Sequence, residues 1–216
     1  MLKRWVLYII GLNLIASAVV LNIRFDLGVA AFSSLMYAIA EIYHISMGTA
    51  SILCYLVFVV VQCVLSKRIT TAFALEIPLS FAFGFLIDVY DFLIPEIHAG
   101  VLLNGVLFTG TLFVTAMGVF LCVKTNLVLP PPDGLTKTIS DVFKLRFSLT
   151  KNGFDATMVL ISASLCLMNH TQFYGIGIGT VLSALFIGRI IKIYENHLLV
   201  NTFFTKQQAA RAAVQS

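Results

Sequence analysis

Asp133 and Lys137 lie one helical turn apart in the stretch PPPDGLTK, residues 130–137, and are the pair best placed for chemistry. The three prolines predict extended backbone that leads into a helix, because proline fixes φ and suits the first helical turn. Asp133 would then lie at the positive end of a short helix, with Lys137 on the same face. Two interpretations stay open: a carboxylate that only caps the helix, or a site for an anion, a proton or a polar headgroup.

Four further polar side chains fall in apolar stretches, where ionisable residues are functional candidates by default. Ser33 and Ser34 begin a second short segment, and they would face Asp133 if the two segments meet. Glu76 and Asp155 could instead serve only to pair with nearby Lys or Arg residues. The predicted substrate-binding residues are therefore Asp133, Lys137, Ser33, Ser34, Glu76 and Asp155.

Catalysis and metal binding are not expected from the motifs. The chain has no G-x-S-x-G, H-E-x-x-H or Walker sequence, and its four cysteines lie singly in apolar runs. The glycines of YGIGIGTVLSALFIG, residues 174–188, have no preceding strand, so close helix packing explains Gly175, Gly179, Ser183 and Gly188 better than a dinucleotide site. We therefore expect no enzyme activity, no metal and no cofactor.

The elements that hold these residues must be membrane helices. The chain of 216 residues is 59% hydrophobic and 11% charged, which exceeds the apolar fraction of a soluble domain. Its basic residues come in pairs at the ends of apolar runs, where they act as topology signals, so nucleic acid is not an expected partner. The sequence predicts an all-α integral membrane protein.

Six runs are long enough to cross a bilayer of about 30 Å, and two segments are too short or too polar. The short segments are residues 27–43 and 130–143. The predicted spans are residues 5–23, 48–66, 72–94, 101–123, 153–169 and 173–194.

A shift of 100 residues superposes 19–43 on 119–143 without a gap. Arg24 then matches Lys124, and Glu41 matches Asp141, which chance matching of apolar residues would not explain. With a few residues inserted, FAFGFLIDVY (81–90) also matches LFIGRIIKIY (185–194). The chain therefore contains two repeats, residues 1–99 and 100–195, and a polar cytoplasmic tail, residues 196–216.

Charge indicates how the short segments lie. If all eight segments crossed, Arg24, Lys67, Arg68 and Lys124 would lie outside, against the positive-inside rule. If the short segments return to the side from which they enter, Arg24 is left as the lone basic residue outside. Each half then crosses three times, so the fold is six transmembrane helices plus two re-entrant half-helices in an inverted repeat, an architecture typical of secondary transporters.

The motif Pro132-Asp133-Gly134-Leu135, following Asn126-Leu127, resembles the YitT/YczE-type family of bacterial membrane proteins, in which such a motif occurs twice per chain. The first copy keeps Asp26-Leu27-Gly28-Val29, but Ala31-Phe32-Ser33 replaces the expected Pro-aromatic-Asp. This resemblance implies topology more than activity, because that family largely lacks an assigned function.

The expected function is a transporter or solute-binding membrane protein for an unknown small polar solute. The alternative is a membrane scaffold or regulator that acts on another membrane protein. A homodimer would compensate for the small size of a carrier. The expected location is the bacterial plasma membrane, with the lipid bilayer as partner and both termini cytoplasmic.

Overall fold

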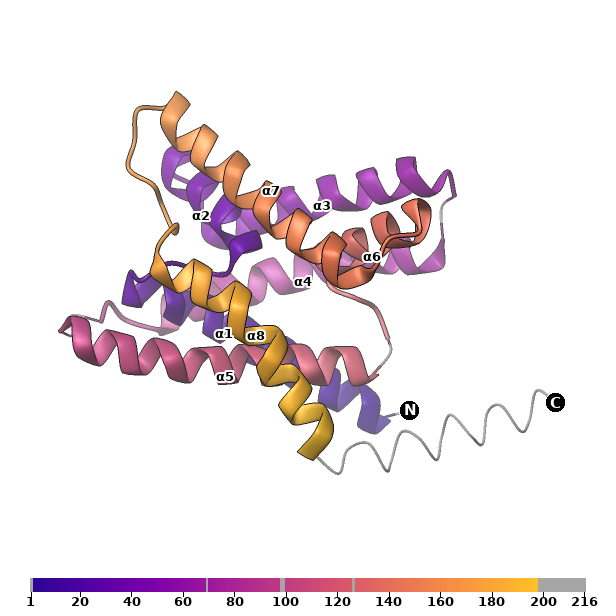
Figure 1. Ribbon diagram of the computed structural model, residues 1–216, viewed down its shortest axis with the longest axis horizontal. Coiled ribbons are helices and arrows are strands. Elements are labelled where there is room, and N and C mark those ends of the chain that lie inside the picture. The colour runs from indigo at the N-terminus through magenta and orange to yellow at the C-terminus, as the bar shows by residue number, and fades with distance from the viewer. Residues whose placement is uncertain (1, 69, 98–99, 126, 198–216) are drawn as a thin grey trace.

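A computed structural model describes residues 2–68, 70–97, 100–125 and 127–197 (Figure 1). Every regular element in these ranges is a helix, as the sequence predicts. The helices are α1 Leu2–Phe25, α2 Ala31–Tyr43, α3 Met47–Ser66, α4 Thr71–Leu93, α5 Val101–Thr125, α6 Pro131–Phe143, α7 Phe147–Met168 and α8 Ile178–His197.

Four of the described helices are long and apolar enough to cross a membrane: α1, α3, α4 and α5. Helices α7 and α8 are also long, at 22 and 20 residues, but their described residues do not meet both criteria. Helix α7 begins before the start of the predicted span 153–169. Helix α8 begins after residue 173, the start of the last predicted span, because residues 169–177 form a connection. Most of the predicted tail lies outside the described residues.

The two short helices, α2 and α6, have matching ends. Each has 13 residues, about 20 Å at 1.5 Å per residue, which is too short to cross the hydrocarbon layer. Each ends at a residue in the left-handed conformation, His44 or Lys144, with φ of 52°. The backbone N–H of that residue donates to Ala40 in α2 and to Ser140 in α6.

Helices at equivalent places in the two halves have similar bounds and contacts. Helices α2 and α6 begin and end 100 residues apart. The Tyr90 hydroxyl of α4 donates to Asn13 of α1, and the Tyr194 hydroxyl of α8 donates to the carbonyl of Phe113 of α5. Asn13 and Phe113 also differ by 100, so α4 packs on α1 much as α8 packs on α5.

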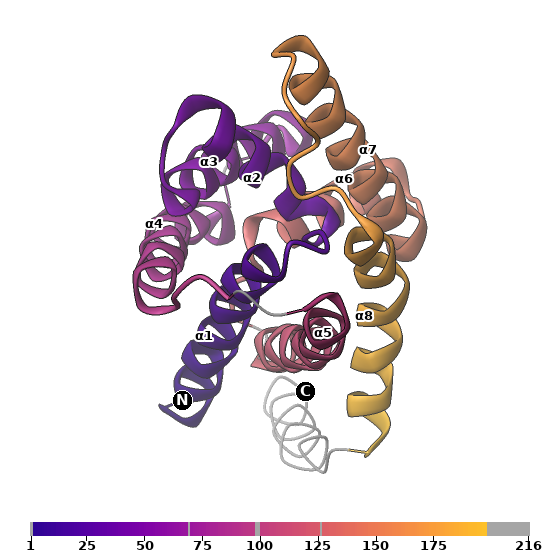
Figure 2. The same ribbon diagram turned by 90° about the vertical axis from the view of Figure 1, so that its left-hand side faces the viewer.

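Helices α1 and α5 lie side by side in extensive contact and run antiparallel (Figure 2). Arg4 at the start of α1 donates to the carbonyl of Thr125 at the end of α5, and Asn104 near the start of α5 donates to the carbonyl of Phe25. The helices approach most closely at Gly11 and Gly118, where a β-carbon at either position would lie within 2.9 Å of the other's carbonyl oxygen. Small residues permit this close approach.

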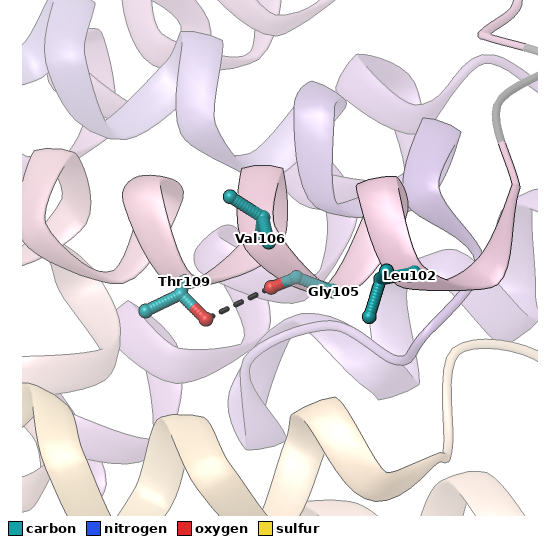
Figure 3. A pocket seen from close by; sticks show the side chains of 4 residues that line it. All are labelled: Leu102, Gly105, Val106 and Thr109. Atoms are coloured by element: carbon teal, nitrogen blue, oxygen red, sulfur yellow. Dashed lines mark hydrogen bonds between the residues drawn. The ribbon is translucent and has the colours of Figure 1, made fainter.

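The outer face of α5 exposes large apolar side chains near the start of the helix. Figure 3 shows Leu102, Gly105, Val106 and Thr109, which line a shallow surface depression and all belong to this one helix. The Thr109 hydroxyl already donates to the carbonyl of Gly105, at 2.8 Å. This face therefore suits contact with lipid.

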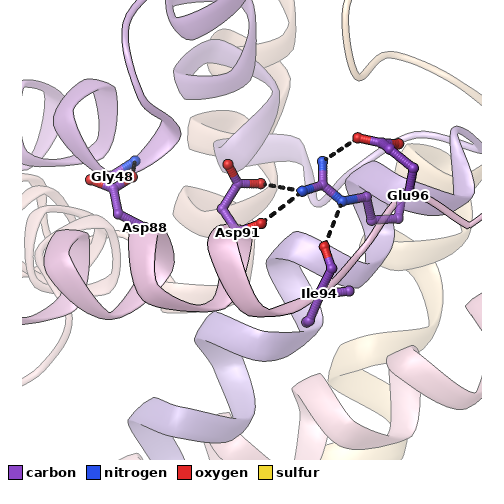
Figure 4. A network of polar contacts seen from close by, with 6 residues as sticks. Gly48, Asp88, Asp91, Ile94 and Glu96 are labelled. Carbon is purple, nitrogen blue, oxygen red and sulfur yellow. Dashed lines mark hydrogen bonds and ion pairs between the residues drawn. The ribbon is translucent and has the colours of Figure 1, made fainter.

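The end of α1 and the start of α3, which α2 connects, lie at the same end of the bundle, where Figure 4 shows the polar contacts of Asp88, Asp91 and Glu96. Arg24, near the end of α1, pairs with Asp91 of α4 at 2.8 Å and with Glu96 at 2.9 Å. Asp88, one turn earlier in α4, accepts from Ser46 at 2.9 Å and from the backbone N–H of Gly48 at 2.8 Å, which caps the start of α3. The end of α1 and the start of α3 thus both adjoin the C-terminal end of α4.

Helix α6 lies toward the other end of α3. Gln62, in the last turns of α3, accepts a hydrogen bond from Thr138 of α6 and donates one to Glu76, near the start of α4. Helices α3 and α4 are therefore antiparallel, since Gly48 and Gly84 meet at their other end. The two short helices are associated with opposite ends of the bundle (Figure 1).

Candidate functional site

A lysine on α7 lies between two carboxylates beside the start of α6. Lys151 Nζ is 3.3 Å from Asp133 of α6 and 3.1 Å from Asp155 of α7. All three side chains are mostly buried, with 25%, 26% and 18% of their surface exposed, respectively. Two helices thus place one ammonium group and two carboxylates in one small volume, which we call the Lys151 cluster.

Asp133 does not cap α6, contrary to one of the two interpretations of the sequence. No side chain caps this helix, and Pro131 and Pro132 have no N–H groups to satisfy. The next two N–H groups, of Asp133 and Gly134, both donate to the carbonyl of Pro130 at 2.9 Å. The carboxylate of Asp133 is therefore available for Lys151.

The Lys151 cluster carries one negative charge in excess when its three groups are ionised. Asp155 Oδ1 is buried and has no hydrogen-bond partner in the described part of the chain, although it lies within ion-pair distance of Lys151. An uncompensated charge is costly in an apolar interior. The arrangement therefore favours a proton or a positively charged group as a further partner.

Two aromatic rings border the ammonium group of Lys151. Its Nζ lies 5.2 Å from the ring centroid of Phe32, at the start of α2, and 5.5 Å from that of Phe154. Ring faces attract cations at such distances. Phe32 also brings the start of α2 to the Lys151 cluster, so residues of α2, α6 and α7 meet here.

Glu76 lies against the same end of α6 but in a different set of contacts. It is buried, and its Oε2 accepts a hydrogen bond of 2.6 Å from the side-chain amide of Gln62. The amide oxygen of Gln62 accepts from the Thr138 hydroxyl at 3.3 Å. A β-carbon at Gly134 would lie only 2.6 Å from Glu76 Oε1, so the glycine lets the carboxylate approach α6.

The other three predicted residues have different surroundings. The Ser34 hydroxyl donates to the carbonyl of Ala31 at 2.7 Å, and its own carbonyl accepts from Ser162 of α7. Ser33 and Ser34 are buried where α2 packs on α7, and it is Phe32 rather than a serine that borders the Lys151 cluster. Lys137 is exposed, and the partner of Asp133 is Lys151.

Sequence reasoning treated Lys151 only as a neutralising neighbour of Asp155. The spacing of four residues between them places both side chains on one helical face. The pairing of Lys151 with Asp133 was not foreseeable from spacing, because it depends on how α7 packs on α6.

The glycines of residues 174–188 serve packing only in the connection before α8 and at the start of that helix. A β-carbon at Gly179 would lie 2.7 Å from the carbonyl of Leu27, and one at Gly175 would lie 2.8 Å from the ring of Tyr37. Gly188 has no neighbouring atom within 4 Å of a β-carbon, so the expected packing role does not hold there.

A family model described as a family of unknown function (DUF6198) matches residues 2–196. The chain belongs to that family. Neither the curated proteins nor the solved structures contain a match. The DUF6198 match extends from α1 through nearly all of α8, so both halves and the Lys151 cluster lie within the matched residues.

Proposed function

We propose that the chain is a small multi-pass membrane carrier whose solute site is the Lys151 cluster. The observation that carries this proposal is the burial of Lys151 between Asp133 and Asp155 at the start of a half-length helix. Ionisable groups inside a membrane mark solute or proton pathways. Half-helix ends near the midplane are where carriers with inverted repeats bind their solutes.

The proposed topology has six spans and two re-entrant helices, α2 and α6, in an inverted repeat. The antiparallel packing of α1 and α5 supports it. If α2, α3 and α4 all crossed, α1 and α5 would cross in the same direction. If α2 returns to its own side, α1 and α5 would cross in opposite directions, which agrees with their antiparallel packing.

The proposed orientation puts both termini in the cytoplasm of a bacterial cell. Arg24 supports this, because its pairing with Asp91 and Glu96 neutralises the one basic residue that the topology leaves outside. Lys67 and Arg68 lie at the opposite end, between α3 and α4, where the positive-inside rule expects them. The resemblance to the YitT/YczE-type family stays a prediction, since the matched family has no stated link to it.

The proposed solute is small and carries a positive charge, such as an amine. A cationic group would neutralise the excess charge of the Lys151 cluster. It would also donate a hydrogen bond to Asp155 Oδ1 and contact the ring of Phe32. A proton would neutralise the same charge when no solute is bound. We propose no catalytic role for these residues.

A ligand screen tests this function against the scaffold alternative. Thermal shifts of the purified protein in nanodiscs would be measured with small amines, amino acids and carboxylic acids, because a ligand of the folded state raises its melting temperature. We expect amines to stabilise the wild type and the control Asp141→Asn, whose exposed carboxylate lies on the same helix, but not Asp133→Asn.

A stabilising amine would then be tested for uptake into liposomes that contain the protein. Uptake that requires Asp133 supports the carrier. Absence of any stabilising solute, or stabilisation that Asp133→Asn retains, would instead favour a scaffold that acts on a membrane partner. Cross-linking in the native membrane would show whether such a partner is a second copy of this chain.

A further inference from the structure

The helix contacts that occur in both halves divide the described chain into two units, and the contact of α3 with α4 joins these units in the first half alone. Helices α2, α3, α6 and α7 pack on one another, with α2 on α7 and α3 on α6, and we call them the mixed unit because it combines both halves. Helices α1, α4, α5 and α8 form the central unit. Its contacts are those of α1 with α5, α1 with α4 and α5 with α8.

The two halves differ in how these units meet. Helix α3 packs closely along α4, whereas the equivalent helices α7 and α8 diverge (Figures 1 and 2). Conversely, α8 contacts α2 more than α4 contacts α6. The mixed unit is therefore rotated so that α3 lies against α4 while α7 is separated from α8.

One pair of equivalent glycines shows this difference directly. A β-carbon at Gly84 of α4 would overlap Ile52 of α3 and lie 2.7 Å from the carbonyl of Gly48. The alignment of 81–90 with 185–194 makes Gly188 its equivalent in α8, and a β-carbon there meets nothing within 4 Å. Gly188 thus leaves room for a close approach of α7 that this arrangement does not make.

We infer that the mixed unit rocks between two arrangements, the present one and one in which α7 packs on α8 at Gly188 while α3 separates from α4. This inference rests on the inverted repeat of the proposed function, since exchanging the conformations of the two halves generates the second arrangement. Glu76 of the central unit touches Gly134 of the mixed unit, beside Asp133. The motion therefore changes the surroundings of the solute site.

The charges at the moving contact explain why the present arrangement is the more stable. Asp88 of α4 accepts from Gly48 and Ser46 at the start of α3, where a carboxylate is favoured by the helix dipole. The equivalent residue of α8 is Lys192, and a cation at the start of α7 would be disfavoured. Asp88→Asn should thus weaken the present contact.

Electron–electron distance measurements on spin-labelled pairs in nanodiscs test the inference. One pair is Val60 with Phe81, on α3 and α4, and the matched pair is Leu160 with Leu185, on α7 and α8. All four side chains are at least 51% exposed, so labels should not disturb packing. We expect Asp88→Asn to raise a short-distance Leu160–Leu185 population roughly threefold, the size of effect that losing a negative charge at a helix N-terminus produces, and to lengthen the Val60–Phe81 distance in step.

A second variant tests the inference even if Asp88→Asn fails to fold. Gly188→Phe should leave the melting temperature unchanged, because Gly188 faces open space, and should remove the short Leu160–Leu185 population. Unchanged distances at both pairs in all variants would overturn the inference. That result would leave the ligand screen unaffected, and a failed screen would not alter the distances, so the two failures are distinguishable.

Discussion

Asp133 of α6 and Lys151 of α7 form an ion pair of 3.3 Å that joins the start of a half-length helix to the neighbouring long helix. The pair is free to form because Pro131 and Pro132 remove the donors that an aspartate in a first turn usually caps. Its stability therefore depends on charge rather than on helix capping.

Replacing Asp133 with Asn should change function without much change in stability. Lys151 keeps Asp155 as its partner, so the excess negative charge disappears while the ammonium group stays paired. We expect the free energy of unfolding to change by less than about 1 kcal/mol, because the remaining charges of Lys151 and Asp155 compensate each other. Binding of an amine should be lost. If Asp133→Asn loses binding only together with a large fall in melting temperature, the pair is only structural.

Replacing Lys151 with Gln should, in contrast, lower the free energy of unfolding. It leaves Asp133 and Asp155 close together without a cation, and breaking a buried pair in this way costs about 3–5 kcal/mol. The double variant with Asp133→Asn should recover part of that loss, as thermal melts would show. Lys137→Gln is the control, since that exposed lysine should matter by less than about 0.5 kcal/mol. Equal melting temperatures of the two lysine variants would contradict the assignment of Lys151 as the partner of the two carboxylates.

Adding a methyl group at Gly134 should disturb the contact of Glu76 with α6. The new β-carbon would lie 2.6 Å from Glu76 Oε1 and 3.1 Å from Gln62 Oε1. Overpacking of this kind costs about 1–3 kcal/mol. Gly153→Ala in α7 is the matched control, because its β-carbon meets nothing and alanine favours a helix by up to about 1 kcal/mol. A neutral Gly134→Ala would mean that Glu76 can move away freely.

The helices and the short segments were predictable because apolar length and proline are local signals, and because the repeat relates one short segment to the other. The bounds of α2 and α6 lie within a few residues of the predicted short segments. The start of α8 was not predictable, since YGIGIG is apolar but packs as a connection, with the Gly179 N–H donating to the carbonyl of Leu27.

The candidate site was predictable only in part. Asp133, Glu76 and Asp155 stood out as ionisable residues in apolar surroundings. Their partners Lys151 and Gln62 depend on which helices pack together, and the packing of α3 on α6 and of α2 on α7 has no signal in spacing. Ser33 and Ser34 were chosen as helix-start equivalents of Asp133, but their neighbour Phe32 makes the contact with Lys151.

The account depends most on both short helices returning to the side from which they enter. Single cysteines would be placed at Tyr43 and Phe143, equivalent residues at the ends of α2 and α6 that are both 59% exposed, and at Arg68 and Glu96 in the connections on either side of α4. The four native cysteines would first be replaced, and intact cells would then be treated with an impermeant thiol reagent.

We expect the reagent to label Tyr43→Cys and Glu96→Cys and to leave Arg68→Cys and Phe143→Cys unlabelled until the cells are opened. Phe143 is cytoplasmic in both topologies and serves as the internal reference. Labelling of Arg68→Cys, with Tyr43→Cys and Glu96→Cys protected, would establish eight crossings and contradict the inverted repeat on which the proposed carrier depends.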